Sequence, residues 1–279
     1  MASLLAIISS ILWGSADFEG GRLSKKHAPL AVLGVSQIFG LIFGVSLLII
    51  FGTSGAKAFG ENGYVIPGIC AGFLGYFGLL CLYSGLASGR MGVVSPISAL
   101  SAVIPLSYAL WRGERLSVIT SIGVVLALGG AFFTSGPEIS QGFSIRPLLL
   151  ALGAAFGFGT ALTFIAIGSQ SSALMTMVTM RAATVGITIA IAIRVRSTGG
   201  FSTRDYPRLA FIGVSDFLAN LLLGIACNSG SISVAMVLGS LYPVATALLA
   251  YKYLHERLRA LQYVGVTMAV IGVALISAF

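Results

Sequence analysis

Long runs of apolar residues, separated by short polar breaks, recur along the whole chain. A helix needs about 20 apolar residues to cross the roughly 30 Å hydrocarbon core of a bilayer. These runs reach that length, and they are too continuous for barrel strands, which alternate in polarity. The pattern predicts an all-α membrane protein of ten transmembrane helices, at residues 2–20, 30–52, 63–84, 92–111, 117–135, 147–167, 173–193, 209–228, 233–252 and 260–278.

An internal repeat relates the two halves of the chain. A shift of 142 residues places the segment 98–130 on the segment 240–272. Apolar composition does not explain two parts of this match: Glu114-Arg115-Leu116 meets Glu256-Arg257-Leu258, and Gly123 and Gly130 meet Gly265 and Gly272. We therefore predict a first five-helix repeat over 1–135, a connecting loop over 136–146 and a second five-helix repeat over 147–279. Because five is odd, the second repeat must enter the membrane with the opposite orientation, which predicts inverted repeats that suit alternating access.

Composition and charge agree with a protein embedded in lipid. Hydrophobic residues make up 57% of the chain and charged residues 9%, against about 25% charged residues in a soluble domain. The net charge of +8 comes from Lys and Arg residues in the short gaps, which form no continuous basic face, so we expect no nucleic-acid partner. The lipid bilayer and a small-molecule substrate are the expected partners, with the protein as a monomer or homodimer.

The distribution of basic residues predicts an orientation. The loops between the predicted helices lie alternately on the two sides of the membrane. With the loops assigned in this way, twelve of the 16 Lys and Arg residues fall on one side, three fall on the other, and Arg181 remains inside the membrane. Basic loops stay cytoplasmic. We therefore predict a multi-pass protein of the plasma membrane of a prokaryote, with both termini outside.

Arg181 lies near the centre of a predicted helix, with Thr184 and Thr188 on the same face. A charge at membrane depth costs several kcal/mol, so it indicates function unless it is paired. The guanidinium could form a buried ion pair with Asp216 that only locks the bundle, or it could bind a carboxylate or phosphate of a substrate.

Three further polar positions lie at membrane depth. Asp216 and Asn220 are four residues apart and share a helix face, and Asp17 shares a face with Trp13. Asp216 and Asp17 are the candidate proton carriers, because the pKa of a buried carboxyl responds to desolvation and to nearby charge. Glu19 lies closer to a basic loop, and we interpret it as an interfacial ion-pair partner of that loop.

Several uncharged side chains could line a substrate path. Aromatic rings beside carboxylates suit cations, although each ring taken alone is more often a packing residue. Pro105 and Pro243 are expected to bend helices and to free backbone carbonyls. The full set of predicted substrate-binding residues is Trp13, Asp17, Gln37, Tyr76, Tyr83, Arg181, Asp216, Asn220 and Tyr242.

Catalysis has little support in the sequence. An enzyme would need a constellation such as paired His ligands, a GxSxG turn or a carboxylate dyad. The only two histidines, His27 and His255, lie in short basic turns with no partner in sequence. We therefore predict no catalytic residues, no metal and no cofactor.

The Trp13-Gly14 pair, the Glu-Arg-Leu turn at 114–116 with Gly123 and Gly130 beyond it, and the same turn at 256–258 resemble the ten-helix, EamA-type branch of the drug/metabolite transporter superfamily. The resemblance implies two inverted five-helix repeats around a central cavity. It also implies a metabolite as cargo, commonly exported, and no enzymatic activity.

We therefore expect a secondary active transporter, an exporter of a small polar metabolite such as an amino acid or organic cation, with the proton as the candidate coupling ion. An uptake carrier of the same fold and a carrier of lipids or amphiphiles remain open alternatives.

Overall fold

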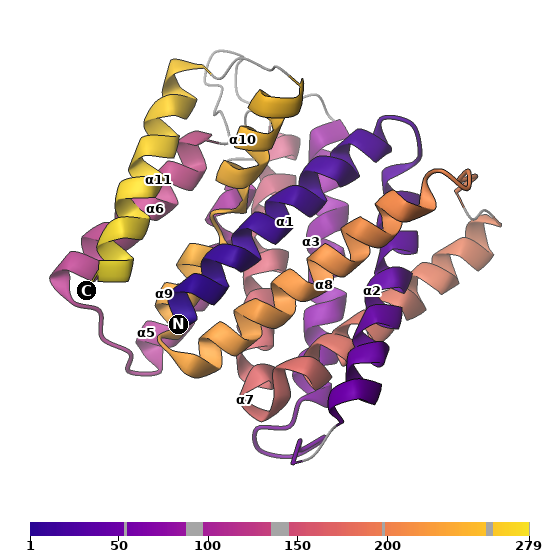
Figure 1. Ribbon diagram of the computed structural model, residues 1–279, viewed down its shortest axis with the longest axis horizontal. Helices are drawn as coiled ribbons and strands as arrows, with labels where there is room; N and C mark the ends of the chain where they lie inside the picture. Colours follow the sequence, from indigo (N-terminus) through magenta and orange to yellow (C-terminus); the bar gives the residue numbers. More distant parts are fainter. Residues whose placement is uncertain (53–54, 88–96, 135–144, 197–198, 255–258, 279) are drawn as a thin grey trace.

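The computed structural model describes residues 1–52, 55–87, 97–134, 145–196, 199–254 and 259–278. These residues form a bundle of helices, and both termini lie on its left side in Figure 1. The elements are α1 (Ala2–Ser24), α2 (Pro29–Phe51), α3 (Val65–Ala87), the 3-10 turn η1 (Leu100–Ala102), α5 (Val103–Trp111), α6 (Val118–Thr134), α7 (Ile145–Val195), α8 (Tyr206–Ser229), α9 (Ile232–Gly239), α10 (Tyr242–Leu254) and α11 (Ala260–Ala278).

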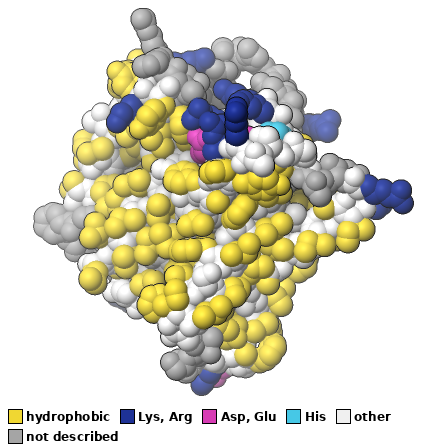
Figure 2. Space-filling view, turned by 45° about the vertical axis from the view of Figure 1, so that its right-hand side comes forward, with side chains coloured by type: hydrophobic (Ala, Val, Ile, Leu, Met, Phe, Trp, Pro, Cys, Tyr) yellow, Lys and Arg dark blue, Asp and Glu magenta, His cyan; other side chains and the backbone are white. Residues whose placement is uncertain are grey.

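The described helices confirm an all-helical, multi-pass membrane protein. Six helical segments have the length and apolar composition needed to cross a membrane, and three shorter apolar helices accompany them. Exposed side chains on the outer faces are largely aliphatic and aromatic, and Figure 2 shows them as a broad hydrophobic band. Because the shorter helices do not satisfy the length criterion, the count of ten crossings stays a prediction.

The helix boundaries differ from the predicted ones in three places. The segments predicted at 147–167 and 173–193 belong to one element, α7, which bends at Ser172, where the backbone is extended (φ −163°, ψ 115°). The segment predicted at 233–252 is two helices, α9 and α10, separated at Ser240 and Leu241. The start of the segment predicted at 92–111 lies partly outside the described residues, and its described part passes through η1.

The two irregular helices correspond to each other in the repeat. The shift of 142 residues places Ser98 on Ser240, so η1 follows directly after the position that matches the break between α9 and α10. Both serines are almost fully buried. Pro243 has no N–H, so it cannot donate to the carbonyl of Gly239 as a helical residue would. Irregular backbone is therefore placed inside the bundle, where protein rather than lipid surrounds it.

Helices from the two halves pack directly on each other. The most extensive pairs are α3 with α7, α6 with α11 and α1 with α8. In the α6–α11 pair, Gly123 meets Gly272 and Ile276, whereas Gly130 meets Ala269. Residue numbers rise along α6 as they fall along α11, so these two repeat-related helices run antiparallel.

Glycines four residues apart on one helix allow close contacts with neighbouring helices. Gly40 and Gly44 of α2 lie against Gly213 and Phe217 of α8. In a bilayer, small residues at such positions let backbones approach and gain dispersion contacts that lipid cannot replace.

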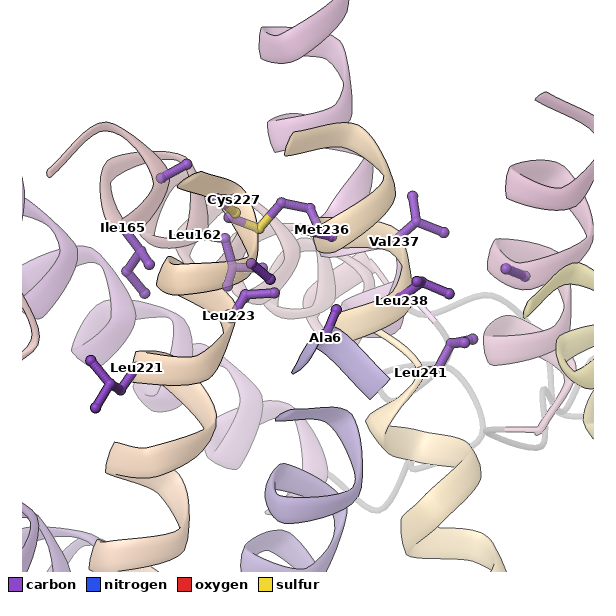
Figure 3. Close-up of a cluster of buried hydrophobic side chains, with 14 of the residues drawn as sticks. Ala6, Leu162, Ile165, Leu221, Leu223, Cys227, Met236, Val237, Leu238 and Leu241 are labelled. Carbon is purple, nitrogen blue, oxygen red and sulfur yellow. The ribbon is translucent and has the colours of Figure 1, made fainter. Parts of the chain in front are cut away.

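The hydrophobic core surrounds the short helix α9. Figure 3 shows Met236 of α9 pointing toward side chains of α7 and α8, whereas Val237 and Leu238 point to the opposite side of α9. These three residues are fully buried. A segment held on all sides in this way positions the break that follows it.

We expect Gly157→Ala to lower the stability of the protein by about 1–3 kcal/mol, because overpacking a close contact forces backbone shifts. A Cβ added at Gly157 would lie 2.7 Å from the Cα and the nitrogen of Gly78 on α3. Gly186→Ala is the matched control on the same helix, since a Cβ there meets nothing within 4 Å. The melting temperature of purified protein in detergent should fall for the first variant only, and an equal fall for both would contradict the packing argument.

Candidate functional site

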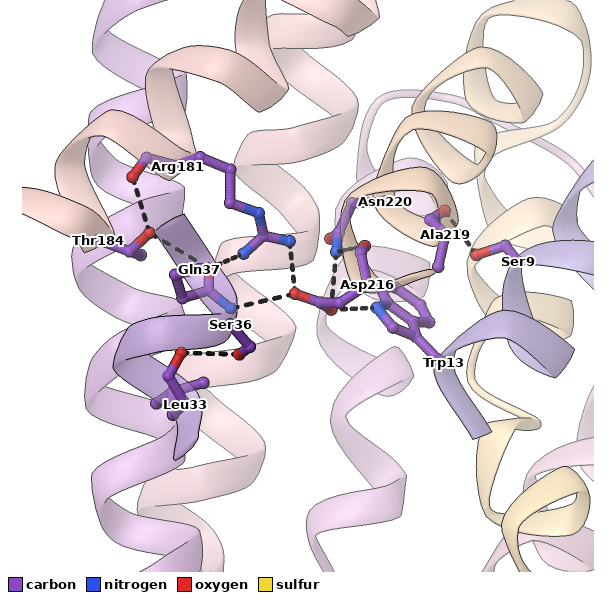
Figure 4. A network of polar contacts seen from close by, with 10 residues as sticks. All are labelled: Ser9, Trp13, Leu33, Ser36, Gln37, Arg181, Thr184, Asp216, Ala219 and Asn220. Atoms are coloured by element: carbon purple, nitrogen blue, oxygen red, sulfur yellow. Dashed lines mark hydrogen bonds and ion pairs between the residues drawn. The ribbon is translucent and has the colours of Figure 1, made fainter. Parts of the chain in front are cut away.

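The carboxylate of Asp216 is the centre of a polar network in the middle of the bundle. Its Oδ1 accepts hydrogen bonds from the indole N–H of Trp13 at 2.9 Å and from Asn220 Nδ2 at 3.2 Å. Its Oδ2 accepts from Gln37 Nε2 at 3.3 Å and lies 2.6 Å from Nη2 of Arg181. Figure 4 shows these groups converging on Asp216 from α1, α2, α7 and α8. The network therefore ties two helices of the first half to two helices of the second.

Arg181 is enclosed by this network. Its side chain is 6% exposed, its Nη1 donates to Oε1 of Gln37, and its Nε is directed toward Gly40 of α2. The hydroxyl of Thr184 donates to the same Gln37 oxygen at 3.3 Å. Of the two partners that the sequence allows for Arg181, the structure contains Asp216, and the Nε of Arg181 is buried without a hydrogen-bond partner among the described residues.

Asp17 has a different environment. On α1 the positions that face outward are Leu4, Ile8 and Ile11, which are 60%, 38% and 52% exposed. At 100° per residue, Asp17 lies on the opposite side of the helix, one turn beyond Trp13. Asp17 is nevertheless exposed, and it interacts electrostatically with Asp216 and Tyr242. The side chain of Asp17 is therefore exposed on the side of α1 that is opposite the outward-facing positions.

The remaining predicted residues are divided between this network and its surroundings. Tyr242 begins α10 and packs edge-on against Trp13, with ring centroids 6.2 Å apart. Tyr76 on α3 is 5% exposed and contacts Thr188, away from Asp216. The side chain of Tyr83 lies outside the described residues. Six of the nine predicted residues thus meet in one network, and Asp17 lies beside it.

The basic end of the molecule carries a second set of ion pairs. Glu19 bridges Arg22 at 3.0 Å and Arg208 of α8 at 3.3 Å, which confirms its interpretation as an interfacial partner of basic residues. His27 lies 3.2 Å from Asp205. Figure 2 shows Lys, Arg and His side chains gathered at this end, above the hydrophobic band. The fold therefore brings together basic loops that the sequence assigns to one side.

We expect Asp205→Asn to destabilise the protein at neutral pH and to matter less in acid. The Ser202 hydroxyl and backbone N–H donate to Asp205 at 2.8 and 2.9 Å, and with His27 nearby they lower the pKa of Asp205 from its ordinary 3.8. Because the pKa is lower in the folded state, the stabilisation is present above 3.8 and is lost as pH falls through the folded pKa. Melting temperatures of wild type and variant should converge toward about pH 3, and a gap that stays constant would contradict this.

Glu114 has a role that the sequence did not indicate. The repeated Glu-Arg-Leu triplet makes Glu114 conspicuous in the sequence, but a charged turn that ends one helix and orients the next is the preferred interpretation of the pattern. In the structure both carboxylate oxygens of Glu114 lie 3.3 Å from the backbone nitrogen of Ser233, in the first turn of α9. A carboxylate is stabilised at a helix N-terminus by the free N–H groups and the helix dipole. Glu114 therefore joins the end of α5 in the first half to α9 in the second.

The side chains of this network limit the chemistry that it could carry out. Within the described ranges, no group of three or more His, Cys, Asp or Glu residues could hold a metal ion. The network instead offers one accessible carboxylate, two aromatic rings and an internally paired guanidinium.

Comparison with known proteins agrees with this architecture. The sequence model of the EamA-like transporter family matches residues 1–136 and, a second time, residues 145–278. A solved structure titled "Crystal structure of protein" has 17% sequence identity and a TM-score of 0.80, over 99% of this chain and 96% of that one. This likeness is one of fold. No curated protein matches the chain.

Proposed function

This chain belongs to the EamA-like transporter family, and from that premise we propose that it is a secondary active transporter that exports a small polar metabolite by alternating access. The family places the protein among membrane transporters and not among enzymes. Substrate, direction and coupling are the parts that we propose.

The observation that carries the proposal is the network around Asp216. It joins α1 and α2 to α7 and α8 at membrane depth through the contacts of Trp13, Gln37 and Arg181. Charged groups are costly at this depth and are retained where they serve a path for substrate or ions. A centre shared by both halves is where an alternating-access carrier binds its substrate.

Inverted repeats provide the movement in this proposal. The two matches to one family model and the antiparallel packing of α6 on α11 support a first repeat over 1–135 and a second over 147–279. Rocking one repeat against the other would open the centre to each side in turn. The contact between Glu114 and α9 is one that such a movement would break.

Proton coupling is proposed from the charges at the centre. Asp216 is paired with the guanidinium of Arg181, and a second carboxylate, that of Asp17, interacts electrostatically with Asp216. Two like charges close together favour proton uptake by one of them. A proton bound on one side of the membrane and released on the other would then drive export.

Transport in proteoliposomes tests the proposal. A thermal-shift screen against amino acids, amines and nucleotide sugars would first identify ligands, since a ligand raises the stability of the state that it binds. We expect these ligands to exchange across the membrane in counterflow, and an imposed pH gradient to drive their accumulation. Glu61→Gln, in the exposed connection after α2, is the carboxylate control and should transport normally. Ligands that bind but do not exchange across the membrane would contradict transport. Counterflow without accumulation in response to the pH gradient would contradict proton coupling.

The orientation of the protein in the membrane is tested separately, in intact cells. We propose that the basic end faces the cytoplasm and both termini face outward, as the loop charges predict. A tag at the C-terminus should then be accessible to protease in intact cells of a prokaryotic host. Protection of that tag would reverse the orientation.

One observation favours a carrier of amphiphiles as a second candidate. A groove of about 390 Å³ lies between α2, α7 and α8, and is lined by Leu47, Phe51, Ala173, Leu174, Leu221, Ile225 and Asn228. Its lining is apolar except for Asn228. Transport of a fluorescent lysolipid that is blocked by Leu221→Trp would support this candidate over a polar metabolite.

A further inference from the structure

The charged side chains in the centre of the bundle differ in how many ion-pair and hydrogen-bond partners they have. Asp216 and Arg181 form an ion pair at 2.6 Å and are further held by Gln37, Trp13 and Asn220. Asp17 has no ion pair or hydrogen bond with any described residue. When both carboxyl groups are ionised, the deep charges that the structure describes therefore sum to one negative charge, and the carboxylate without a partner is that of Asp17.

The unpaired carboxylate is accessible. Asp17 is exposed although it lies on the inward side of α1, opposite the lipid-facing positions Leu4, Ile8 and Ile11. A carboxylate that only stabilised the fold would have a fixed cation or several hydrogen-bond donors beside it. Asp17 interacts electrostatically with Asp216, and a bound cation would relieve the repulsion between the two carboxylates.

Aromatic rings stand beside this carboxylate. Trp13 lies one helical turn from Asp17 on the same face. The ring of Tyr242 packs edge-on against Trp13 and interacts electrostatically with Asp17. A cation over a tryptophan or tyrosine ring gains about 0.5–2 kcal/mol, and an organic ammonium group is the type of cation that uses this contact.

From these contacts we propose that Asp17, Trp13 and Tyr242 bind the positively charged ammonium group of the transported metabolite. The inference deepens the proposed function, on which it rests. The guanidinium of Arg181 is paired with Asp216 and is 6% exposed, so we assign it to holding the site and not to contacting the substrate. The substrate is then a cation or carries its cationic group into this space.

Binding can be measured without transport because Trp13 is a natural reporter. The chain has two tryptophans, and the other, Trp111, is 81% exposed at the end of α5. In a Trp111→Phe background, the fluorescence of Trp13 in detergent-purified protein should change saturably with methylammonium or tetramethylammonium chloride. Sodium chloride, potassium acetate and the neutral analogue tert-butanol at equal concentrations should give no saturable change.

Substitutions at position 17 identify the group responsible. We expect Asp17→Asn to weaken binding of both organic cations at least tenfold, while Glu61→Gln leaves the affinity unchanged. If Asp17→Asn does not fold, Asp17→Glu replaces it: moving the carboxylate by one methylene should change the affinity ratio of the small and the large cation. Unchanged affinity in Asp17→Asn, or an unchanged ratio in Asp17→Glu, would overturn the inference.

The outcomes separate this inference from the proposed function. Saturation by sodium or acetate alone, or by none of the probes, overturns the cation site whatever the protein transports. Saturable cation binding without counterflow supports the site and contradicts the transporter. Counterflow of a ligand that carries no positive charge contradicts the site and supports the transporter.

Discussion

Replacing Arg181 by alanine is expected to destabilise the protein by about 3–5 kcal/mol and to abolish transport, because one partner of a buried ion pair would remain without its counter-charge. Arg181 is the cation that lies 2.6 Å from Asp216, and it also donates to Gln37. Its loss leaves a carboxylate at membrane depth with only the neutral donors of Trp13, Gln37 and Asn220. Since the Asp216 side chain is 24% exposed, water reduces the penalty toward the lower end of this range.

The double variant Arg181→Met, Asp216→Leu is the matched control. Replacing both members of a buried ion pair by apolar residues is often neutral for stability. We therefore expect the double variant to recover most of the melting temperature lost by Arg181→Ala, and still not to transport. A single variant as stable as wild type would show that the pair contributes nothing to the fold.

Much of the helical architecture could be predicted from the sequence because lipid imposes a simple requirement. Backbone groups must be hydrogen-bonded within the segment, so any apolar run of sufficient length forms a helix. The exceptions are instructive. The extended residue Ser172 and the break at Ser240 and Leu241 interrupt apolar sequence, and only Pro243 gave a signal for the second. Hydropathy measures the cost of exposure to lipid, and it does not detect where neighbouring helices replace a lost hydrogen bond.

The sequence indicates which residues are candidates for the site, but it does not indicate how they are arranged in space. Arg181, Asp216 and Asp17 stand out because charges are rare in such segments. Their pairing could not be read from the sequence, since helical periodicity relates residues within one helix and says nothing of rotation between helices. Gln37 illustrates the difficulty: it bridges Arg181 and Asp216, yet in sequence it is one amide in an apolar run.

The contact of Glu114 with α9 is a second kind of interaction that could not be predicted from the sequence. Its charge and its repetition at Glu256 were visible in the sequence. The partner is a backbone N–H, that of Ser233, and a backbone group leaves no mark on composition or spacing. A capping interaction between distant segments therefore becomes visible only when the chain is folded.

Asp17→Asn is expected to combine lost transport with unchanged or increased stability, the opposite of Arg181→Ala. The carboxylate of Asp17 has no ion-pair partner in the described part of the chain and interacts electrostatically with Asp216. Its negative charge therefore repels that of Asp216, and no contact of Asp17 offsets this repulsion. Because the side chain is accessible to water, screening limits the gain to about 1 kcal/mol. Activity that depends on a destabilising group is characteristic of a functional site.

Stability and transport measured on the same preparations test this contrast. The melting temperature of Asp17→Asn in detergent without ligand should equal or exceed that of wild type, whereas counterflow in proteoliposomes should fall to the level of protein-free vesicles. Ligands that raise the melting temperature of wild type should no longer do so, since the stabilisation by mass action requires binding. A variant that loses stability together with transport would instead place Asp17 among the residues that hold the bundle, as Arg181 does. The two variants thus distinguish a charge that stabilises the fold from one that the fold leaves available to a substrate.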